Sequence, residues 1–299
     1  MQKMASMSCN PAVGGVAKGQ IVREIDALGG RMARITDHST IQFRMLNRSK
    51  GAAMWSPRAQ CDKELFSRLW RHELENTPNL YIWQDAATEL LFEEGAEGTM
   101  PRITGVRTRM GVEFKARAVV LTAGTFLGGL MHCGERNAEG GRAGDAASHG
   151  ITEALVERGF EVGRMKTGTP ARIDGRSVDF SQLEIQPGDA EPSKFSFSAD
   201  TQVVKEQKPC YLVYTSVDVH DHLRTGFDRS PLFNGTIQGI GPRYCPSIED
   251  KLRTFAEKEQ HQLFLEPEGR DTNEYYINGF SSSLPQEIQL AALRKIRGL

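Results

Sequence analysis

The sequence predicts a fold of the α/β class, and three features of its hydrophobic pattern lead to this prediction. Apolar residues recur at helical spacing in the segments 16–28 and 62–76, which predicts two amphipathic helices. Between residues 79 and 117 the pattern changes to a period of two, which predicts strands. The run 118–124 is apolar without alternation, as expected of a parallel strand that is covered on both faces.

The remaining elements follow from local signals along the chain. The first helix comes after a glycine-rich loop and ends at Gly29 and Gly30. A last helix is predicted at 285–297, because Pro285 suits the first turn and the apolar residues behind it align on one face. Met110 and Gly111 are predicted to turn a hairpin. Strands are predicted at 40–46, 80–83, 89–92, 102–109, 112–117, 118–124 and 211–215.

Composition excludes several classes of protein. The 299 residues are 39% hydrophobic and 25% charged, which excludes a disordered chain. No run of 18 apolar residues and no signal peptide are present, so we expect a protein that neither spans a membrane nor is exported. The net charge of −1 gives no indication of nucleic acid binding.

The cysteines indicate reduced thiols. Five of them occur, an odd number, without any Cys-x-x-Cys pair. This argues for a cytoplasmic protein and against a zinc ribbon, and no metal site is expected. The five are Cys9, Cys61, Cys133, Cys210 and Cys245.

The first candidate site is the glycine-rich segment 8–19. Its glycines, among them Gly14 and Gly15, let the backbone approach a planar or anionic ligand, and the following helix offers free amides. Cys9 and Asn10 lie in the same segment, where a thiol can have a lowered pKa. The pattern fits equally a plain turn beside an inert buried cysteine.

The second candidate site is the end of the apolar run, at Thr122, Ala123 and Gly124. In flavoproteins a strand of this kind ends at a glycine whose backbone approaches the cofactor. Any buried strand closed by a glycine turn has the same pattern. Downstream, Ser148 lies near the start of a predicted helix at 152–157, as a ligand contact or as a plain cap.

The third candidate site is the segment 239–253. Ser247 with Asp250 predicts a helix start, so that Cys245 lies just ahead of a helix N-terminus, near Arg243 and Lys251. A reactive thiolate is chemically reasonable there, and a structural cysteine beside a capped surface helix is the alternative.

Two weaker patterns favour structural roles. His220 and His222 are interpreted as a solvated turn rather than a metal site, because histidines two apart diverge on a helix. A basic set could contact phosphates, although a solvated charged face explains it as well. That set is Arg44, Arg48, Lys50 and Arg58, interleaved with Asn47 and Trp55.

Taken together, these motifs resemble one family. The most specific of them is the segment Gly241-Pro-Arg-Tyr-Cys-Pro-Ser-Ile-Glu-Asp-Lys251, because few proteins outside this family have a similar segment. The chain resembles the MnmG family, also called GidA, of FAD-dependent tRNA uridine 5-carboxymethylaminomethyl modification enzymes. The resemblance runs nearly end to end and rests on the segments 7–15, 42–51, 121–126, 140–145, 166–170, 241–251 and 264–269.

The resemblance implies a FAD/NAD(P)-binding, Rossmann-like domain of the glutathione-reductase type with a smaller inserted α/β domain. Residues 1–167 would form the first part of the FAD-binding domain, and residues 269–299 the return to it. The inserted, NADH-associated domain is expected at 168–268, because the composition turns irregular after Pro170. Such enzymes act with the GTPase MnmE on the wobble uridine of tRNA, as a homodimer within a heterotetramer in the cytoplasm. FAD carries the redox step, and NADH can reduce it.

The resemblance also assigns residues to the site. By matched motif, Ala87 and Ser148 fall at FAD contacts, and Cys9 and Cys245 match two cysteines implicated in activity. Cys245 is the preferred nucleophile. The cofactor-binding residues expected from pattern and resemblance together are Asn10, Gly14, Gly15, Ala87, Thr122, Ala123, Gly124, Ser148, Gly241, Pro242, Arg243, Tyr244, Pro246, Ser247 and Lys251.

The sequence departs from the family pattern at both ends. The strand and Gly-x-Gly-x-x-Gly turn that hold the FAD pyrophosphate do not occur in it, nor does the carboxyl-terminal half that is expected to bind MnmE and tRNA. We therefore expect a fragment that binds FAD weakly or not at all by itself. The alternatives are a related folate- and FAD-dependent tRNA uridine methyltransferase, a FAD reductase and a non-catalytic fragment.

Overall fold

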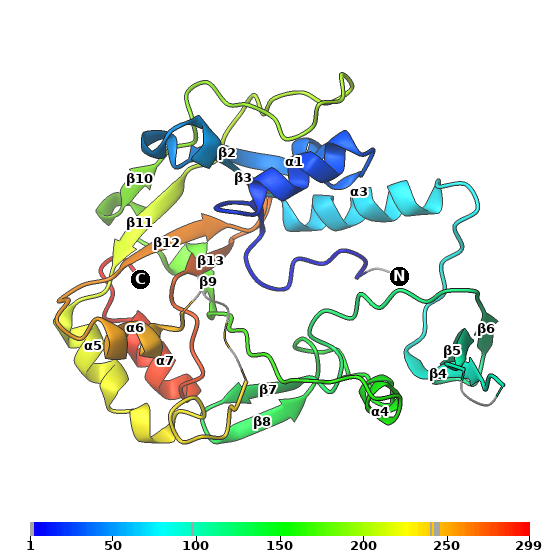
Figure 1. Ribbon diagram of the computed structural model, residues 1–299. Helices are drawn as coiled ribbons and strands as arrows, with labels where there is room; N and C mark the ends of the chain where they lie inside the picture. The colour runs from blue at the N-terminus through cyan, green and yellow to red at the C-terminus, as the bar shows by residue number, and fades with distance from the viewer. Residues whose placement is uncertain (1–2, 97–98, 240, 242–245) are drawn as a thin grey trace. The chain divides into compact units, whose positions relative to one another are not determined.

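The computed structural model describes residues 3–96, 99–239, 241 and 246–299, and the chain divides into two compact units (Figure 1). The first unit comprises residues 1–81, 167–227 and 242–299. The second comprises residues 82–166 and 228–241.

The first unit begins with a three-stranded antiparallel sheet in the order β1-β3-β2. Three helices accompany this sheet, and their apolar residues form a small core with Val13, Phe43 and Phe195. The longest helix, α3, begins after Asp62, whose carboxylate accepts a hydrogen bond from the Leu65 amide. The elements are β1 (Ala12–Gly14), α1 (Gly19–Ala27), α2 (Met32–Ser39), β2 (Thr40–Leu46), β3 (Ser56–Cys61) and α3 (Lys63–Glu75).

The same unit contains a five-stranded antiparallel sheet in the order β10-β11-β12-β13-β9. Residues far apart in the sequence pair here, since Tyr276 lies opposite Glu266 on one side and Arg172 on the other. The strands are β9 (Arg172–Asp174), β10 (Glu184–Gln186), β11 (Cys210–Tyr214), β12 (Gln262–Pro267) and β13 (Glu274–Asn278). The helices of this region are α5 (Val217–Arg224), α6 (Ile248–Thr254) and α7 (Gln286–Leu293).

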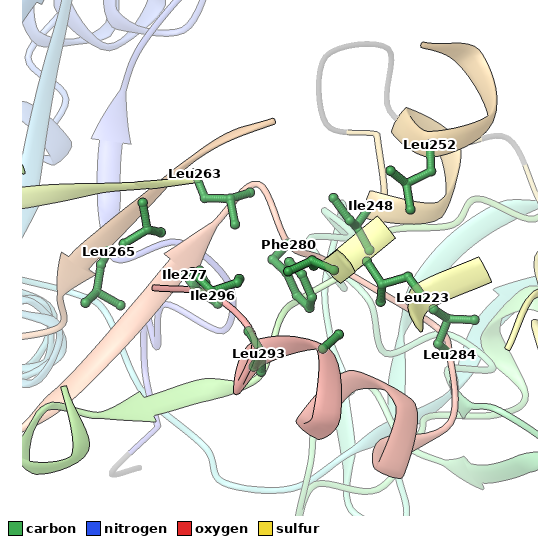
Figure 2. Packing of buried hydrophobic residues seen from close by; sticks show 13 residues of the cluster. Leu223, Ile248, Leu252, Leu263, Leu265, Ile277, Phe280, Leu284, Leu293 and Ile296 are labelled. Carbon is green, nitrogen blue, oxygen red and sulfur yellow. The ribbon is translucent and has the colours of Figure 1, made fainter. Parts of the chain in front are cut away.

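One face of the five-stranded sheet carries the main hydrophobic core. Alternate residues of β12 and β13, including Leu263, Leu265 and Ile277, are fully buried in a cluster with side chains from the three helices. Figure 2 shows Phe280 among these side chains, near Ile248. The opposite face therefore remains for polar residues, and it carries the candidate site.

The second unit is built from short antiparallel pairings. One sheet has the order β4-β5-β6, and β7 pairs with β8. The elements are β4 (Ala87–Glu93), β5 (Arg102–Thr108), β6 (Glu113–Lys115), β7 (Leu130–Cys133), β8 (Arg136–Glu139) and α4 (Ile151–Glu157).

Most of the predicted elements are confirmed. The strand 40–46 has the predicted bounds, the helix 62–76 is α3 within one residue at each end, and Met110-Gly111 turns the β5–β6 hairpin. The first helix begins at Gly19 rather than at residue 16, because Ala17 has a φ of +63°, which a right-handed helix does not accommodate. The last helix ends at Leu293, earlier than predicted.

Two predicted strands are wrong. Residues 80–83 and 118–124 have no strand structure, and Val120 is 85% exposed where burial on both faces was expected. A strand needs a partner for its backbone groups, and no described strand pairs with either segment. Every pairing of named strands in the described part of the chain is antiparallel, so the predicted parallel strand is absent from these residues.

The compact units and the predicted domains have different boundaries. A break at residue 167 is common to both, whereas residues 242–268 share a unit, and a sheet, with residues 269–299. The assignment of residues 1–167, 168–268 and 269–299 to domains stays a prediction.

Candidate functional site

The glycine turn at the start of the chain is fixed by steric necessity. Gly14 has a φ of +83°, and a Cβ atom there would lie 2.3 Å from the Pro57 carbonyl oxygen and 2.6 Å from Phe195 Cζ. The next residue, Gly15, has a φ of +94° and donates a hydrogen bond of 2.9 Å to the same carbonyl. A Cβ atom at Gly15 would meet nothing within 4 Å. The turn is therefore tightly packed at Gly14 and open at Gly15.

This difference predicts unequal effects of two alanine substitutions. Gly14→Ala should lower the free energy of unfolding by at least about 2 kcal/mol, because it adds a backbone clash to an unfavourable φ. Gly15→Ala is the matched control and should cost about 1 kcal/mol from backbone strain alone. Urea unfolding of both variants measures the difference, and equal losses would show that the clash is relieved at little cost.

Cys9 lies just before this turn, against β13. Its Sγ atom is 3.1 Å from the hydroxyl oxygen of Tyr276, and it donates to the Gly168 carbonyl oxygen over 3.7 Å. The Cys9 side chain is partly buried, whereas Tyr276 is buried. The thiol is thus held near a fixed hydroxyl and is still reachable from solvent.

Asn10 belongs to a buried polar cluster built around an ion pair. Arg58 of β3 donates to Glu266 Oε1 over 2.7 Å and to Gln60 Oε1 over 3.0 Å, with a longer contact of 3.4 Å to Asn10 Oδ1. Asn278 also donates to Glu266 Oε1, over 3.3 Å. The Arg58 and Glu266 side chains are only 15% and 4% exposed. Arg58 is therefore a buried structural cation rather than part of a solvated basic face, which corrects that interpretation of the sequence.

The Glu266 carboxyl is deeply buried, and its contacts offset only part of the cost of burying a negative charge. Burial raises its pKa, although the attraction of Arg58 and the neighbouring hydrogen bonds lower it. Its Oε2 atom is buried and has no hydrogen-bond partner among the described residues. A carboxyl in this state favours the protonated form more than an ordinary glutamate does.

A second buried carboxylate, Glu268, lies two residues further on the same face. Lys63 donates to Glu268 Oε2 over 2.6 Å, and Arg172 donates to Glu268 Oε1 over 2.5 Å. Arg172 also donates to the carbonyl oxygens of Ser8 and Cys9, over 3.3 Å and 3.0 Å. This network joins three distant parts of the chain beneath the Cys9 loop.

In the second unit, two residues expected to contact the cofactor lie side by side. The Ser148 hydroxyl donates to the Ala87 carbonyl oxygen over 2.8 Å. Ser148 therefore does not cap the helix that follows, which begins after Gly150. Thr122, Ala123 and Gly124 lie in a loop. Gly124 has a φ of +57°, and a Cβ atom there would meet nothing within 4 Å.

The segment 241–251, which is the most specific part of the family resemblance, is described only in part. Pro242, Arg243, Tyr244 and Cys245 lie outside the described residues, so their roles stay predictions. Pro246 is partly buried. Gly241 packs closely on the Lys166 side chain, where a Cβ would lie 2.6 Å from Cε.

The start of α6 agrees with the capping pattern. The Ser247 hydroxyl accepts a hydrogen bond from the Asp250 amide over 3.1 Å. Lys251 donates to the Gly279 carbonyl oxygen over 2.7 Å. Glu249 is fully buried and accepts hydrogen bonds from Ser282 and Ser283, which ties α6 to the segment after β13.

The interpretation of the histidine pair as a solvated turn is wrong, because both residues lie on α5 and His220 is buried. His220 is buried on α5, its Nε2 lies 2.6 Å from the Thr215 hydroxyl, and burial lowers its pKa to about 4. Among the residues that the structure describes, no group of three or more His, Cys, Asp or Glu side chains could hold a metal ion.

Sequence reasoning missed Arg172, Glu266, Glu268 and Tyr276. The sequence does carry one signal, since two glutamates interrupt the otherwise apolar run Phe264-Leu-Glu-Pro-Glu, and a glutamate among apolar residues is rarely buried unless it is paired. Their partners come from β3, α3 and β9, which no local pattern connects to β12.

Comparison with known proteins places these residues in a family context. The family model described as "Glucose inhibited division protein A" matches residues 1–299. A curated relative from Porphyromonas gingivalis, named tRNA uridine 5-carboxymethylaminomethyl modification enzyme MnmG, is 62% identical over 299 residues, which are 100% of this chain and 47% of the relative. A relative of the same name from Flavobacterium johnsoniae is 58% identical over 298 residues, again 100% of this chain and 47% of the relative. The chain thus spans about half the length of the curated relatives it matches.

A solved structure is similar to this chain in its fold as well as in its sequence. The structure of Aquifex aeolicus GidA in its form I crystal matches with a TM-score of 0.91 and 48% identity, covering 100% of this chain and 50% of that one. The α/β FAD-binding fold class predicted from the sequence is confirmed by this similarity. No helix within the described part of the chain is both long and apolar enough to cross a membrane.

Proposed function

Because the chain belongs to the glucose inhibited division protein A (GidA) family, we propose that it acts in the 5-carboxymethylaminomethyl modification of uridine in tRNA. The observation that carries this proposal is the 62% identity, over the whole chain, to a relative named for that modification. The relatives share this one name, which supports the reaction over a uridine methyltransferase, a FAD reductase or a non-catalytic role.

The GidA family is FAD-dependent, and the glycine turns of this chain fit contact with such a cofactor. At Gly15 and Gly124 the backbone has a positive φ and open space on its Cα, which allows a planar ring or a phosphate to approach closely. Asn10, Gly14 and Gly15 are proposed FAD contacts in the first unit, and Ala87, Ser148 and the loop 122–124 in the second. When bound, FAD would supply the redox step of the reaction.

We also propose a reductant, a partner and a cellular setting. NADH would serve as reductant, with the segment 241–255 as its associated region. The GTPase MnmE would be the partner, in an assembly that contains a homodimer of the complete enzyme, and the setting would be cytoplasmic. The name of the relatives supports tRNA as the proposed substrate.

The chemistry of the thiols suits the substrate. A thiolate that adds to C6 of uracil turns C5 into an enolate-like carbon, which can form a bond to a one-carbon electrophile. Loss of the C5 proton and departure of the thiolate then restore the ring. Cys245 is our first choice for this nucleophile, and Cys9 has either a redox or a positioning role.

A chimera tests the function directly. Residues 1–299 would replace the matching segment of the Porphyromonas gingivalis relative, and the chimera would be expressed in a bacterial strain that lacks its own enzyme of this family. We expect mass spectrometry of tRNA nucleosides to show the 5-carboxymethylaminomethyl uridine restored. If a well-expressed chimera leaves uridine unmodified, while the unaltered relative restores the product, the proposed function is wrong.

A further inference from the structure

The geometry around Cys9 assigns a role to a residue that the sequence motifs do not single out. We propose that Tyr276 is a positioning residue for Cys9, and that its hydroxyl donates a hydrogen bond to the Cys9 sulfur and holds it in one orientation. The inference rests on the proposed function, in which Cys9 is one of two candidate catalytic thiols.

Cys9 and Tyr276 are in direct contact. The distance of 3.1 Å between Cys9 Sγ and the Tyr276 hydroxyl oxygen is short for a hydrogen bond to sulfur. Sγ also faces the Gly168 carbonyl oxygen at 3.7 Å. A carbonyl only accepts, so the thiol proton points toward Gly168 and the tyrosine proton can point toward sulfur. When the thiol loses its proton, the tyrosine remains as a donor to the anion.

Tyr276 is held in place by its surroundings. It lies in the middle of β13 and is 3% exposed. The Arg172 guanidinium stacks on its ring, with the central carbon 4.8 Å from the ring centroid. Arg172 is fixed in turn by buried Glu268. The hydroxyl is therefore held at a defined place rather than on a flexible loop.

Arg172 also holds the backbone that carries the Cys9 thiol. Arg172 Nη2 donates to the carbonyl oxygens of Ser8 and Cys9, and Nη1 donates to Thr169 Oγ1 over 2.8 Å. One guanidinium thus sets the position of the tyrosine ring, of the cysteine backbone and of the segment that contains Gly168. An arrangement that fixes a thiol on three sides is typical of preorganisation rather than of simple packing.

The test measures the reactivity of Cys9 in the whole chain and needs neither FAD nor tRNA, so its result is independent of the proposed function. Cys133→Ser and Cys245→Ser provide the background. Cys61 and Cys210 are buried, and burial raises the pKa of each thiol to about 12, which leaves Cys9 as the thiol that iodoacetamide modifies near neutral pH. The variant is Tyr276→Phe, which keeps the ring and its stack on Arg172.

We expect Tyr276→Phe to slow alkylation of Cys9 about tenfold at neutral pH, because the nucleophilic thiolate loses a hydrogen bond. The matched control is Tyr275→Phe, which removes the same atom on the same strand from a side chain that faces the hydrophobic core. An unchanged alkylation rate in folded Tyr276→Phe, or an equal change in Tyr275→Phe, would overturn the proposal.

A second measurement covers the case in which Tyr276→Phe does not fold, as judged by circular dichroism. Cys9→Ala in the wild-type background removes the partner from the other side and should shift the near-ultraviolet tyrosine absorbance. The same substitution in the Tyr275→Phe background should give the same difference spectrum. No tyrosine difference spectrum in folded Cys9→Ala would contradict the proposed hydrogen bond.

Discussion

Arg58→Met is expected to lower the free energy of unfolding by about 3–5 kcal/mol at pH 7, because it leaves the buried Glu266 carboxylate without its counter-charge. Methionine fills much of the same volume, so the loss is chiefly electrostatic. It also removes the donor to Gln60 and Asn10, which adds to the effect. Chemical denaturation of the folded chain measures the difference.

The destabilisation caused by Arg58→Met should increase from acid toward neutral pH. Burial already raises the Glu266 pKa, and removing Arg58 takes away an attraction that lowers it. A group with a raised folded-state pKa stabilises the fold fully below its unfolded value, which is about 4.3 for glutamate, and loses this contribution as the pH rises through the folded-state pKa. Arg58→Met should therefore be least harmful in acid and increasingly harmful toward neutral pH.

Two further variants control this prediction. Arg48→Met breaks an ion pair with Asp189 in which the arginine is 56% exposed, and it should cost at most about 1 kcal/mol. Adding Glu266→Gln to Arg58→Met removes the uncompensated charge and should recover part of the loss. If Arg58→Met is as mild as Arg48→Met at every pH, the buried pair does not act as described.

Cys245→Ser in the chimera is expected to abolish uridine modification, lowering the rate by about three orders of magnitude or more if this thiol is the nucleophile. Serine differs from cysteine by one atom and little volume, so the flavin spectrum should stay intact. The measurement is the rate of product formation on tRNA beside the absorbance spectrum of the purified protein.

The matched control is Cys133→Ser, which changes an exposed thiol on β7 and should leave the rate unchanged. Cys9→Ser separates the two candidate thiols, because a redox or positioning role for Cys9 predicts a slowed reaction rather than none. Modification by Cys245→Ser at near the unaltered rate would mean that Cys245 is structural.

Elements with strong local signals were predictable from the sequence. The helix α3 has its cap at Asp62 and its apolar stripe within thirteen residues, and the strand 40–46 has its alternation within seven. The hairpin at Gly111 likewise depends on adjacent residues. In each case the sequence signal for the element lies within the element or its caps.

The other features depend on contacts that no window of sequence contains. The run 118–124 has the composition of a buried strand, yet strand structure requires neighbours with free hydrogen-bonding edges. At Cys9, Asn10 and the glycine turn, which form one short motif, a candidate site was predictable from the sequence, although its role stays a prediction. The supporting layer was not, because Arg58 and Glu266 are separated by more than two hundred residues.

The two buried glutamates of the β12 region also have a consequence for how the sheet assembles. Glu266 and Glu268 share one face, while Leu263 and Leu265 occupy the other. Slippage of this segment by a single residue would turn both carboxylates into the hydrocarbon interior and expose both leucines. Misaligned pairings of the chain would thus be heavily penalised during folding. Glu266 and Glu268 therefore favour the correct register of this strand, whatever they contribute to the stability of the finished fold.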